Sequence, residues 1–552
     1  MKYSFSISDS HNHFIEIKTE INVQDIPILN LQLPAWRPGR YELGNFSKNI
    51  KDFSVVDQDG GFVEFKKSSK DCWVVSTEKL DRVYISYLYY AADLNAGATF
   101  LDENQLYVNP INCCLYNDNT IDQPCEVVLN IPSDYKTATS LTRVNEFHFK
   151  AIDFHQLVDS PFICSNSIKQ YEYSSYGTTF HLCFQGEVKP NLKKLIADFK
   201  KFTDYQIERF KSFPVKEYYF LFQITPYASY HGVEHQQSTV ILLGPSYAVF
   251  DEKYDSLLGI SSHELYHTWN VKTIRPDHML PYDYAKENYT DMGYVTEGVT
   301  TYMGDRILYE SGVFSQKQYF KELNTLLTRH YHNDGRKHYS VAESSYDTWL
   351  DGYVSGIPGR KVSIYVEGAL IALICDARIR KNTNGDFSLH DVIAQMYSGS
   401  TTLSGYNKES YQQLLEKVSG SSFQDIFDDL IYGNSDFSPY LNEAFNYYSW
   451  RFIAEVDSAV TNNFGFKAQR SSNGFKIQAV LEQSSAACSG LVLGDVIHAV
   501  NGFKLNNDLN NWLTYFKTDQ LVLSIERKGV LKRLELKQPN DFQFFKYKML
   551  TN

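Results

Sequence analysis

The 552-residue chain carries 53 Lys and Arg residues against 65 Asp and Glu residues, for a formal net charge of −12. Its length predicts three or four domains, at roughly 100–200 residues each, and the 43% hydrophobic and 21% charged residues are typical of a soluble globular protein. The acidic charge argues against nucleic-acid binding, and the absence of any run of about 18 apolar residues predicts no membrane-spanning helix.

Residues 1–168 alternate apolar and polar positions in short runs such as 14–18 and 83–88. A period of two is typical of strands with one buried face, and turn residues such as 59–61 separate the runs. We therefore expect an antiparallel β-domain over residues 1–168, without a helix of any length.

The hydrophobic period changes near residue 190. Apolar residues at three- and four-residue steps predict a long amphipathic helix from Leu192 to Ile207, followed by a short strand at 218–224. Helical patterns dominate over 252–434 and include an apolar run at 368–374, which predicts a buried helix. The middle domain, residues 169–450, is expected to be mainly α-helical.

Strand patterns return after residue 450. Asn-Gly pairs at 473–474 and 501–502 are typical of hairpin turns, because both residue types tolerate positive φ. These features predict a small separate domain at 451–545.

The eight cysteines include no C-x-x-C pair, and their density is far below that of a disulfide scaffold. The first residues already alternate like a strand, so we expect no signal peptide. Reduced, mostly buried thiols and a cytoplasmic protein are the expectation.

The sequence 262–270 contains the pattern H-E-x-x-H. On a helix, His263 and His267 are four residues apart and lie on one face, where both can reach one metal ion. Glu264 can hold a water at that ion without being a ligand. A core stripe of Leu258, Leu265 and Trp269 on the opposite side supports the helix.

A third ligand is available downstream at Glu297. It lies thirty residues after His267, in a mildly apolar run at 293–302 that looks like the start of a helix. Two imidazoles and one carboxylate are ligands that suit zinc and leave a fourth position open. We expect one zinc per chain, and zinc chemistry of this kind hydrolyses peptides.

Three further residues are candidates for contact with substrate. Glu234, in a segment just after the predicted strand 218–224, can bind a free amino group, unless that segment is an ordinary surface loop. Gly232 has no side chain and lets a substrate backbone pass close. Tyr365, at the start of the buried helix, can donate to a developing oxyanion.

The sequence resembles the zinc metallopeptidases of the glycyl aminopeptidase type, which carry a C-terminal PDZ domain. The similar stretches span most of the chain, and those outside the C-terminal region lie at 33–41, 263–272, 274–276 and 297–302. The resemblance implies a thermolysin-like, mainly α catalytic domain of the gluzincin type.

The same resemblance implies roles for individual residues. His263, His267 and Glu297 would be the zinc ligands and Glu264 the general base. The segment 232–235 is similar to the motif whose Glu holds the substrate's α-amino group. Tyr365 matches the transition-state tyrosine of the related enzymes.

The C-terminal region resembles a PDZ fold. Phe464, Gly465 and Phe466 look like its carboxylate-binding loop, and 489–502 is similar to its most recognisable stretch. Two alternatives stay open: a domain that binds protein C-termini, or one that only packs against the catalytic unit.

Three functions compete. The first is a zinc aminopeptidase that removes Gly and Ala from peptide N-termini, and the second is a zinc endopeptidase that recruits protein C-termini through the PDZ domain. The third is an inactive scaffold that binds peptides. The intact metal motif argues against this third function. Peptide substrates are the expected partners.

Overall fold

The computed structural model describes residues 1–24, 26–353, 356–398, 404–517 and 519–552. The chain divides into two compact units, Met1–Tyr319 with Gly335–Phe437, and Phe320–Asp334 with Ser438–Asn552. None of the helices in the described part of the chain combines the length and apolar character needed to cross a bilayer.

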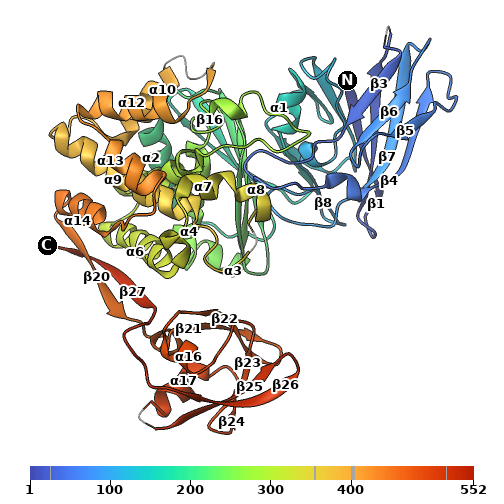
Figure 1. Ribbon diagram of the computed structural model, residues 1–552. Coiled ribbons are helices and arrows are strands. Elements are labelled where there is room, and N and C mark those ends of the chain that lie inside the picture. The colour runs from blue at the N-terminus through green and yellow to red at the C-terminus, as the bar shows by residue number, and fades with distance from the viewer. Residues whose placement is uncertain (25, 354–355, 399–403, 518) are drawn as a thin grey trace. The chain divides into compact units, whose positions relative to one another are not determined.

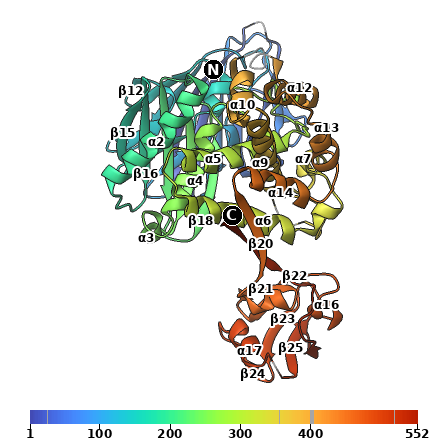
Figure 2. The same ribbon diagram turned by 90° about the vertical axis from the view of Figure 1, so that its left-hand side faces the viewer.

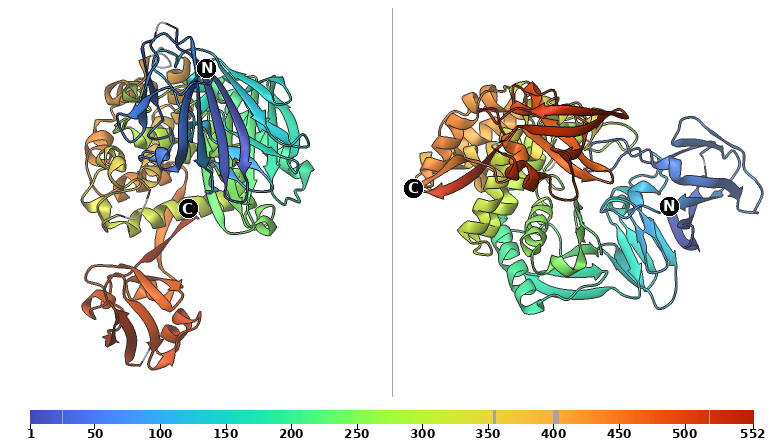
Figure 3. Two further views of the ribbon diagram at one scale, coloured as in Figure 1. Left: turned by 90° about the vertical axis from the view of Figure 1, so that its right-hand side faces the viewer. Right: turned by 90° about the horizontal axis from the view of Figure 1, so that it is seen from below.

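The N-terminal region forms a seven-stranded sheet in the order β12-β13-β10-β1-β2-β7-β4. Its strands lie side by side in Figure 3 (left, blue to teal). Their bounds are Lys2–Asp9 (β1), Phe14–Asn22 (β2), Ile50–Asp57 (β4), Arg82–Tyr90 (β7), Cys125–Asn130 (β10), Thr142–Asn145 (β12) and His148–Ala151 (β13).

This β-rich region differs from the sequence prediction in two details. Strand β1 pairs with β10 in parallel, although the other pairs in this sheet are antiparallel. A short helix, α1 (Phe154–Val158), interrupts the strands, because the Asp153 side chain caps it by accepting the Gln156 N–H. Alternation alone did not indicate either feature.

A second sheet lies at the centre of the first unit, in the order β15-β16-β17-β19-β18. Its strands are β15 (Lys169–Ser175), β16 (Thr178–Gln185), β17 (Glu217–Ile224), β18 (Ser229–Glu234) and β19 (Ser238–Gly244). Helices α2 (Leu192–Phe210) and α4 (Tyr254–Tyr266) contact this sheet (Figure 2). The predicted helix from residue 192 and the predicted strand at 218–224 are thus confirmed.

The two faces of the central sheet have different neighbours. Phe220 packs edge-on against Phe199 of α2, with ring centroids 5.2 Å apart. Leu221, the next residue of β17, points to the other face. There, Leu221 and Val233 pack with Tyr107 from the N-terminal region in one apolar cluster. Strand β18 is an edge of this sheet, so its outer backbone groups have no neighbouring strand among the described residues.

Helices make up most of the rest of the first unit (Figure 1). The main ones are α5 (Thr300–Glu310), α9 (Ile364–Asn382), α10 (Leu389–Ser398) and α12 (Lys408–Ser419), together with the first residues of α6 (Gln316–His332). Helix α9 is the buried helix predicted from its apolar run.

The second unit contains a sheet in which β21 (Phe466–Ser471), β22 (Gly474–Val480), β23 (Val496–Val500), β25 (Leu521–Arg527) and β26 (Val530–Leu536) follow one another. Both predicted Asn-Gly hairpins form: Asn501 and Gly502, with φ of 49° and 85°, join β23 to β24 (Phe503–Lys504). The other hairpin joins β21 to β22.

This unit is larger than the contiguous segment 451–545 expected from the sequence. The final strand β27 (Phe545–Thr551) pairs with β20 (Trp450–Val456). Tyr547 stacks on Tyr331 of α6 at a centroid distance of 4.3 Å. A helical segment distant in sequence thereby becomes part of the second unit, which no local pattern indicates.

Candidate active site

Helix α4 presents the first histidine of the H-E-x-x-H pattern, and the helix ends sooner than expected. It stops at Tyr266, and His267 is its C-cap with φ −60° and ψ −21°. His267 therefore keeps the i+4 position on the face of His263. Trp269 lies beyond the helix but is still buried, where its ring stacks on Phe210 at 4.3 Å.

Three potential metal ligands converge at this point. The Nε2 atoms of His263 and His267 are 3.0 Å apart, and Glu297 Oε2 lies 3.4 Å from His267 Nε2 and 3.9 Å from His263 Nε2. Separations of 3–4 Å are those expected for ligand atoms around one zinc with bonds of about 2.0–2.2 Å. The cluster is a donor set that fits zinc.

The turn after α4 fixes the tautomer of His267. Its Nδ1 lies 2.8 Å from the carbonyl oxygen of Asn270, which can only accept, so Nδ1 carries the hydrogen. The Nε2 lone pair is therefore free for a metal, an arrangement typical of ligating histidines. The Asn270 Nδ2 in turn donates to the carbonyl of Val295 at 2.8 Å and to Thr300 Oγ1 at 3.0 Å.

Glu297 lies in a π-helical segment, Tyr294–Val299, that precedes α5. Asn270 thus ties the histidine turn to this segment by its hydrogen bond to Val295. The π-helical segment crosses α9 at Gly298 and Gly368, where an added Cβ on either residue would overlap the other's backbone. The close crossing brings the first turn of α9 beside the metal cluster.

Glu264 and Glu234 place two carboxylates beside the histidines. Glu234, Glu264 and His267 offer ligand-type atoms that all lie within 4.8 Å of one another. Burial is the main cause that raises the pKa of Glu264 well above its ordinary value, and the Glu234 and Glu297 carboxylates add to it. One oxygen of Glu234 and one of Glu264 are buried without a hydrogen-bond partner among the described residues.

Glu234 is the last residue of strand β18, and not part of a loop after a strand. Because side chains alternate along a strand, Glu234 and Gly232 share the face that looks toward α4. The space where a side chain at 232 would stand is filled by the Glu264 carboxylate. The structure therefore assigns Gly232 a packing requirement that the sequence did not reveal.

The N-terminal segment 33–41 also reaches this site. Gly39, with φ of +80°, lies so close to Glu234 that a Cβ there would overlap the carboxylate. Arg37, a residue only 5% exposed, interacts electrostatically with Glu234 through its guanidinium. The sequence singled out this segment only as a similar turn, because no local pattern shows that residues two hundred positions apart meet.

Tyr365 stands on the first turn of α9, among other tyrosines. Its ring lies 6.5 Å from that of Tyr353, measured between ring centroids. Burial and the Glu297 carboxylate raise the pKa of Tyr365, so its hydroxyl stays protonated at neutral pH. Tyr41, also near Glu297, has a buried hydroxyl without a partner in the described ranges. Neither Tyr41 nor Tyr353 was a candidate from the sequence.

Two protein-family models match the chain. The Peptidase M61 N-terminal domain matches residues 2–166, and the M61 glycyl aminopeptidase matches residues 256–371, which hold the metal cluster and Tyr365. The chain is a metallopeptidase. No curated protein sequence matches it.

Two solved structures are similar to the chain. An aminopeptidase N family protein from Idiomarina loihiensis is similar to this metallopeptidase with a TM-score of 0.92 and 27% identity, over 100% of this chain and 98% of that one. An M1 zinc metallopeptidase from Deinococcus radiodurans, bound to a Tyr-Ser-Ala substrate, has a TM-score of 0.50 at 10% identity, over 79% of this chain and 94% of that one. The second likeness concerns the fold alone.

The loop at 464–466 in the metallopeptidase's second unit is closed by its own backbone. The Gly465 N–H donates to the Asn462 carbonyl at 3.0 Å, and the Phe464 N–H is directed at the Val460 carbonyl at 3.4 Å. Phe466 begins β21, and the Phe542 carbonyl oxygen would lie 2.9 Å from a Cβ at Gly465. Two of the amides expected to receive a ligand carboxylate are therefore already engaged.

Proposed function

We propose that this metallopeptidase is a zinc-dependent aminopeptidase that removes small residues, Gly and Ala, from peptide N-termini. The observation that carries the proposal is the Glu234 carboxylate, which lies within 4.8 Å of Glu264 and His267 and has an unpartnered buried oxygen. A carboxylate at that distance from the metal cluster suits an ammonium group one residue away from the bond to be cut.

His263, His267 and Glu297 would hold one zinc per chain. The ion would supply Lewis acidity, which polarises the scissile carbonyl and acidifies the attacking water. The converging Nε2 atoms and the contact between His267 and Asn270 support this set, because a hydrogen bond to the other ring nitrogen orients a ligating imidazole.

Glu264 is proposed as the general base. Its carboxylate oxygen takes the proton of the attacking water and then passes that proton to the nitrogen of the leaving amine. Burial raises the pKa of Glu264, so its carboxylate is a stronger base than that of an exposed Glu. Its unpartnered Oε2 is an acceptor with no competing donor among the described residues.

Tyr365 is proposed to donate its hydroxyl hydrogen to the carbonyl oxygen as that oxygen gains negative charge. Glu234 would accept hydrogen bonds from the substrate's α-ammonium group. The N-terminal segment at Gly39 fills the space beside Glu234, which favours a small first residue over a large one.

The alternatives are less well supported. An endopeptidase has no free amine for Glu234 to bind, and an inactive scaffold has no need of a complete donor set.

We infer that the second unit is a PDZ domain with a structural role, because two of its loop amides are engaged within the loop. The eight cysteines are all free thiols, six of them buried, which supports a reducing compartment such as the cytoplasm.

The test of the proposed function is hydrolysis of glycyl and alanyl anilides by zinc-loaded protein, before and after chelation, beside the Glu264→Gln variant. We expect chelation to abolish turnover, and Glu264→Gln to lower kcat by roughly 100- to 10,000-fold while zinc stays bound. Chelated protein that keeps its turnover, or a zinc-loaded Gln variant that matches the wild type, would refute the proposal.

A further inference from the structure

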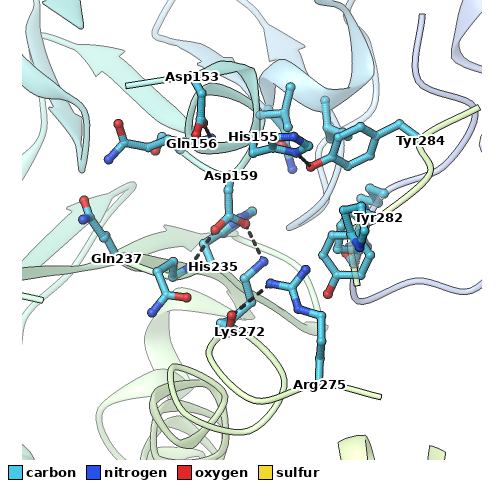
Figure 4. Close-up of a pocket in the computed structure, with 18 of the residues that line it drawn as sticks. Asp153, His155, Gln156, Asp159, His235, Gln237, Lys272, Arg275, Tyr282 and Tyr284 are labelled. Carbon is cyan, nitrogen blue, oxygen red and sulfur yellow. Dashed lines mark hydrogen bonds and ion pairs between the residues drawn. The ribbon is translucent and has the colours of Figure 1, made fainter. Parts of the chain in front are cut away.

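A cavity of about 400 Å³ lies in the first unit, apart from the metal cluster (Figure 4). Its walls come from helix α1, from the turn after β18 and from the segment 272–284, and Arg37 also contributes. The three candidate metal ligands do not line this cavity, and neither do Glu234 and Glu264. The volume falls within the range of about 300–1,000 Å³ typical of small-molecule sites.

The acidic residues of this cavity are already engaged. Asp159 accepts hydrogen bonds from Lys272 Nζ at 2.7 Å and from the Gln236 N–H at 2.8 Å, and it lies 3.1 Å from His235 Nδ1. Asp153 accepts the Gln156 N–H as the N-cap of α1. Lys272 and Asp159 point toward each other in Figure 4.

Two cations in the cavity wall have no carboxylate hydrogen-bonded to them among the described residues, although Arg37 also interacts electrostatically with Glu234, which lies outside the cavity lining. Arg37 donates to the Pro38 carbonyl at 3.3 Å, and Arg275 donates to the Lys272 carbonyl at 2.9 Å and lies over the Tyr282 ring at 4.2 Å. Within the described ranges, neither guanidinium has a carboxylate within 4 Å. The cavity therefore carries a surplus of positive charge.

Three residues that line the cavity have buried polar atoms without a hydrogen-bond partner among the described residues. Asn109 is fully buried, and neither its Nδ2 nor its Oδ1 has a hydrogen-bond partner in the described part of the chain. His235 Nε2, in a residue 4% exposed, and Arg275 Nε also lack one. Buried polar groups are nearly always hydrogen-bonded, so such a group in the wall of a cavity points to a ligand.

Apolar and aromatic surface completes the cavity. Val158, Ile111, Tyr282 and Tyr284 are buried and line it beside the polar groups. A ligand that suits both kinds of wall has a compact anionic head and a small apolar body.

We propose that this cavity binds the carboxylate of a small organic molecule. Arg37 and Arg275 supply the counter-charge, the Asn109 Nδ2 donates a hydrogen bond, and the aromatic wall receives the apolar body. A planar guanidinium matches a carboxylate in charge and geometry, which favours this head group over a neutral one. The carboxylate is that of a free molecule, because the small first residue proposed for the substrate carries no acidic group.

The experiment titrates sodium benzoate and its neutral analogue benzamide into the zinc-loaded full chain by calorimetry. We expect benzoate to bind at least about 10-fold more tightly than benzamide, and Arg275→Gln to weaken benzoate binding by about 10-fold or more. The control is Arg143→Gln, since Arg143 also lies over an aromatic ring, Phe149 at 4.8 Å, but not in this cavity.

A second variant, Asn109→Leu, removes both unpaired amide atoms and keeps the test decisive if Arg275→Gln does not fold. Equal binding of benzoate and benzamide, or benzoate binding that Arg275→Gln and Asn109→Leu leave unchanged, would overturn the proposal. The last result would place benzoate elsewhere, such as at the metal cluster.

A kinetic arm tests whether the carboxylate is instead an acidic first side chain of a substrate, which would contradict the preference for Gly and Ala proposed above. If it is a substrate side chain, Arg275→Gln lowers kcat/KM for a glutamyl anilide but not for a glutaminyl anilide. If it is a free molecule, both anilides respond alike, while benzoate still binds as above. Because the calorimetry needs no turnover, failure of the proposed peptidase activity would leave this result interpretable on its own.

Discussion

The Glu264 carboxylate occupies the space that a side chain at Gly232 would need, so that a Cβ built on Gly232 would overlap Glu264 Oε1. Gly232→Ala should therefore displace the proposed general base without touching the metal ligands. A shift of about 1 Å in a catalytic group can cost roughly 100-fold in rate. We expect kcat on glycyl anilide to fall by about that factor, with unchanged zinc content.

A matched control lies on the metal helix itself. Gly259 in α4 has only Asp305 Oδ1 near its added Cβ, at an ordinary contact distance of 3.7 Å. Gly259→Ala should keep wild-type turnover. If both Ala variants turn over like the wild type, Glu264 does not need its observed position.

Asn270→Ala should weaken zinc binding, although Asn270 is not a proposed ligand. Its side chain links the His267 turn to Val295 and Thr300, beside Glu297. Loss of such a supporting contact typically costs 10- to 100-fold in metal affinity, and we expect a change of about that size. Competition against a chelator measures it. Asn382→Ala, at the far end of α9, is the control, and equal affinities in the two variants would refute the role of Asn270.

Tyr365→Phe should lower kcat with little change in KM, because the hydroxyl is proposed to act only as charge develops on the carbonyl oxygen. Loss of one such donor costs about 2.7–4 kcal/mol, or roughly 100- to 1,000-fold. Tyr353→Phe should cost less, since Tyr353 lies beside Tyr365, at 6.5 Å between ring centroids, and is not itself proposed to touch the substrate. Steady-state kinetics separates the two parameters, and a loss confined to KM would assign Tyr365 to substrate binding.

The ion pair of the partly buried Asp159 and the buried Lys272 should make stability depend on pH. Burial raises the pKa of Asp159, but Lys272 and His235 outweigh it and hold the pKa well below its ordinary value. A depressed pKa contributes stability above the unfolded-state pKa of about 3.9, and this contribution is lost as pH falls toward the folded-state pKa.

Asp159→Asn should thus destabilise the chain most at neutral pH, by about 3–5 kcal/mol, because it leaves Lys272 buried without its partner. The melting-temperature difference from the wild type should shrink between pH 7 and pH 3. Chelated protein is used throughout, so that zinc loss at low pH does not contribute. A difference that stays constant or grows toward pH 3 would contradict the assignment.

The metal cluster shows what the sequence could predict. His263, Glu264 and His267 are encoded in five consecutive residues, and helical geometry alone places both histidines on one face. The π-helical turn that carries Glu297 was not predictable, because a single widened turn leaves no hydrophobic period to detect. Beyond the early end of α4, the chain turns so that the Asn270 carbonyl meets His267 Nδ1, a contact that a pattern of side chains does not show.

The rest of the site depends on contacts between distant segments. Arg37, Gly39 and Tyr41 reach Glu234 and Glu297 from the N-terminal region, and Tyr353 reaches Tyr365 from the loop before α9. Period and composition describe a segment by itself, so they identify the elements but not which elements meet. The two-part second unit, with its contribution from α6, went unpredicted for the same reason.

The most direct test of the central claim compares wild type and Glu234→Ala on glycyl anilide and on its N-acetylated form. Loss of a hydrogen bond to a charged group costs about 1.5–3 kcal/mol. The account predicts that wild type cleaves only the free-amine substrate efficiently, and that Glu234→Ala lowers kcat/KM on it by roughly 10- to 100-fold. Efficient cleavage of the acetylated substrate by wild type, or equal losses on both substrates in the variant, would contradict an aminopeptidase that anchors the free amine on Glu234.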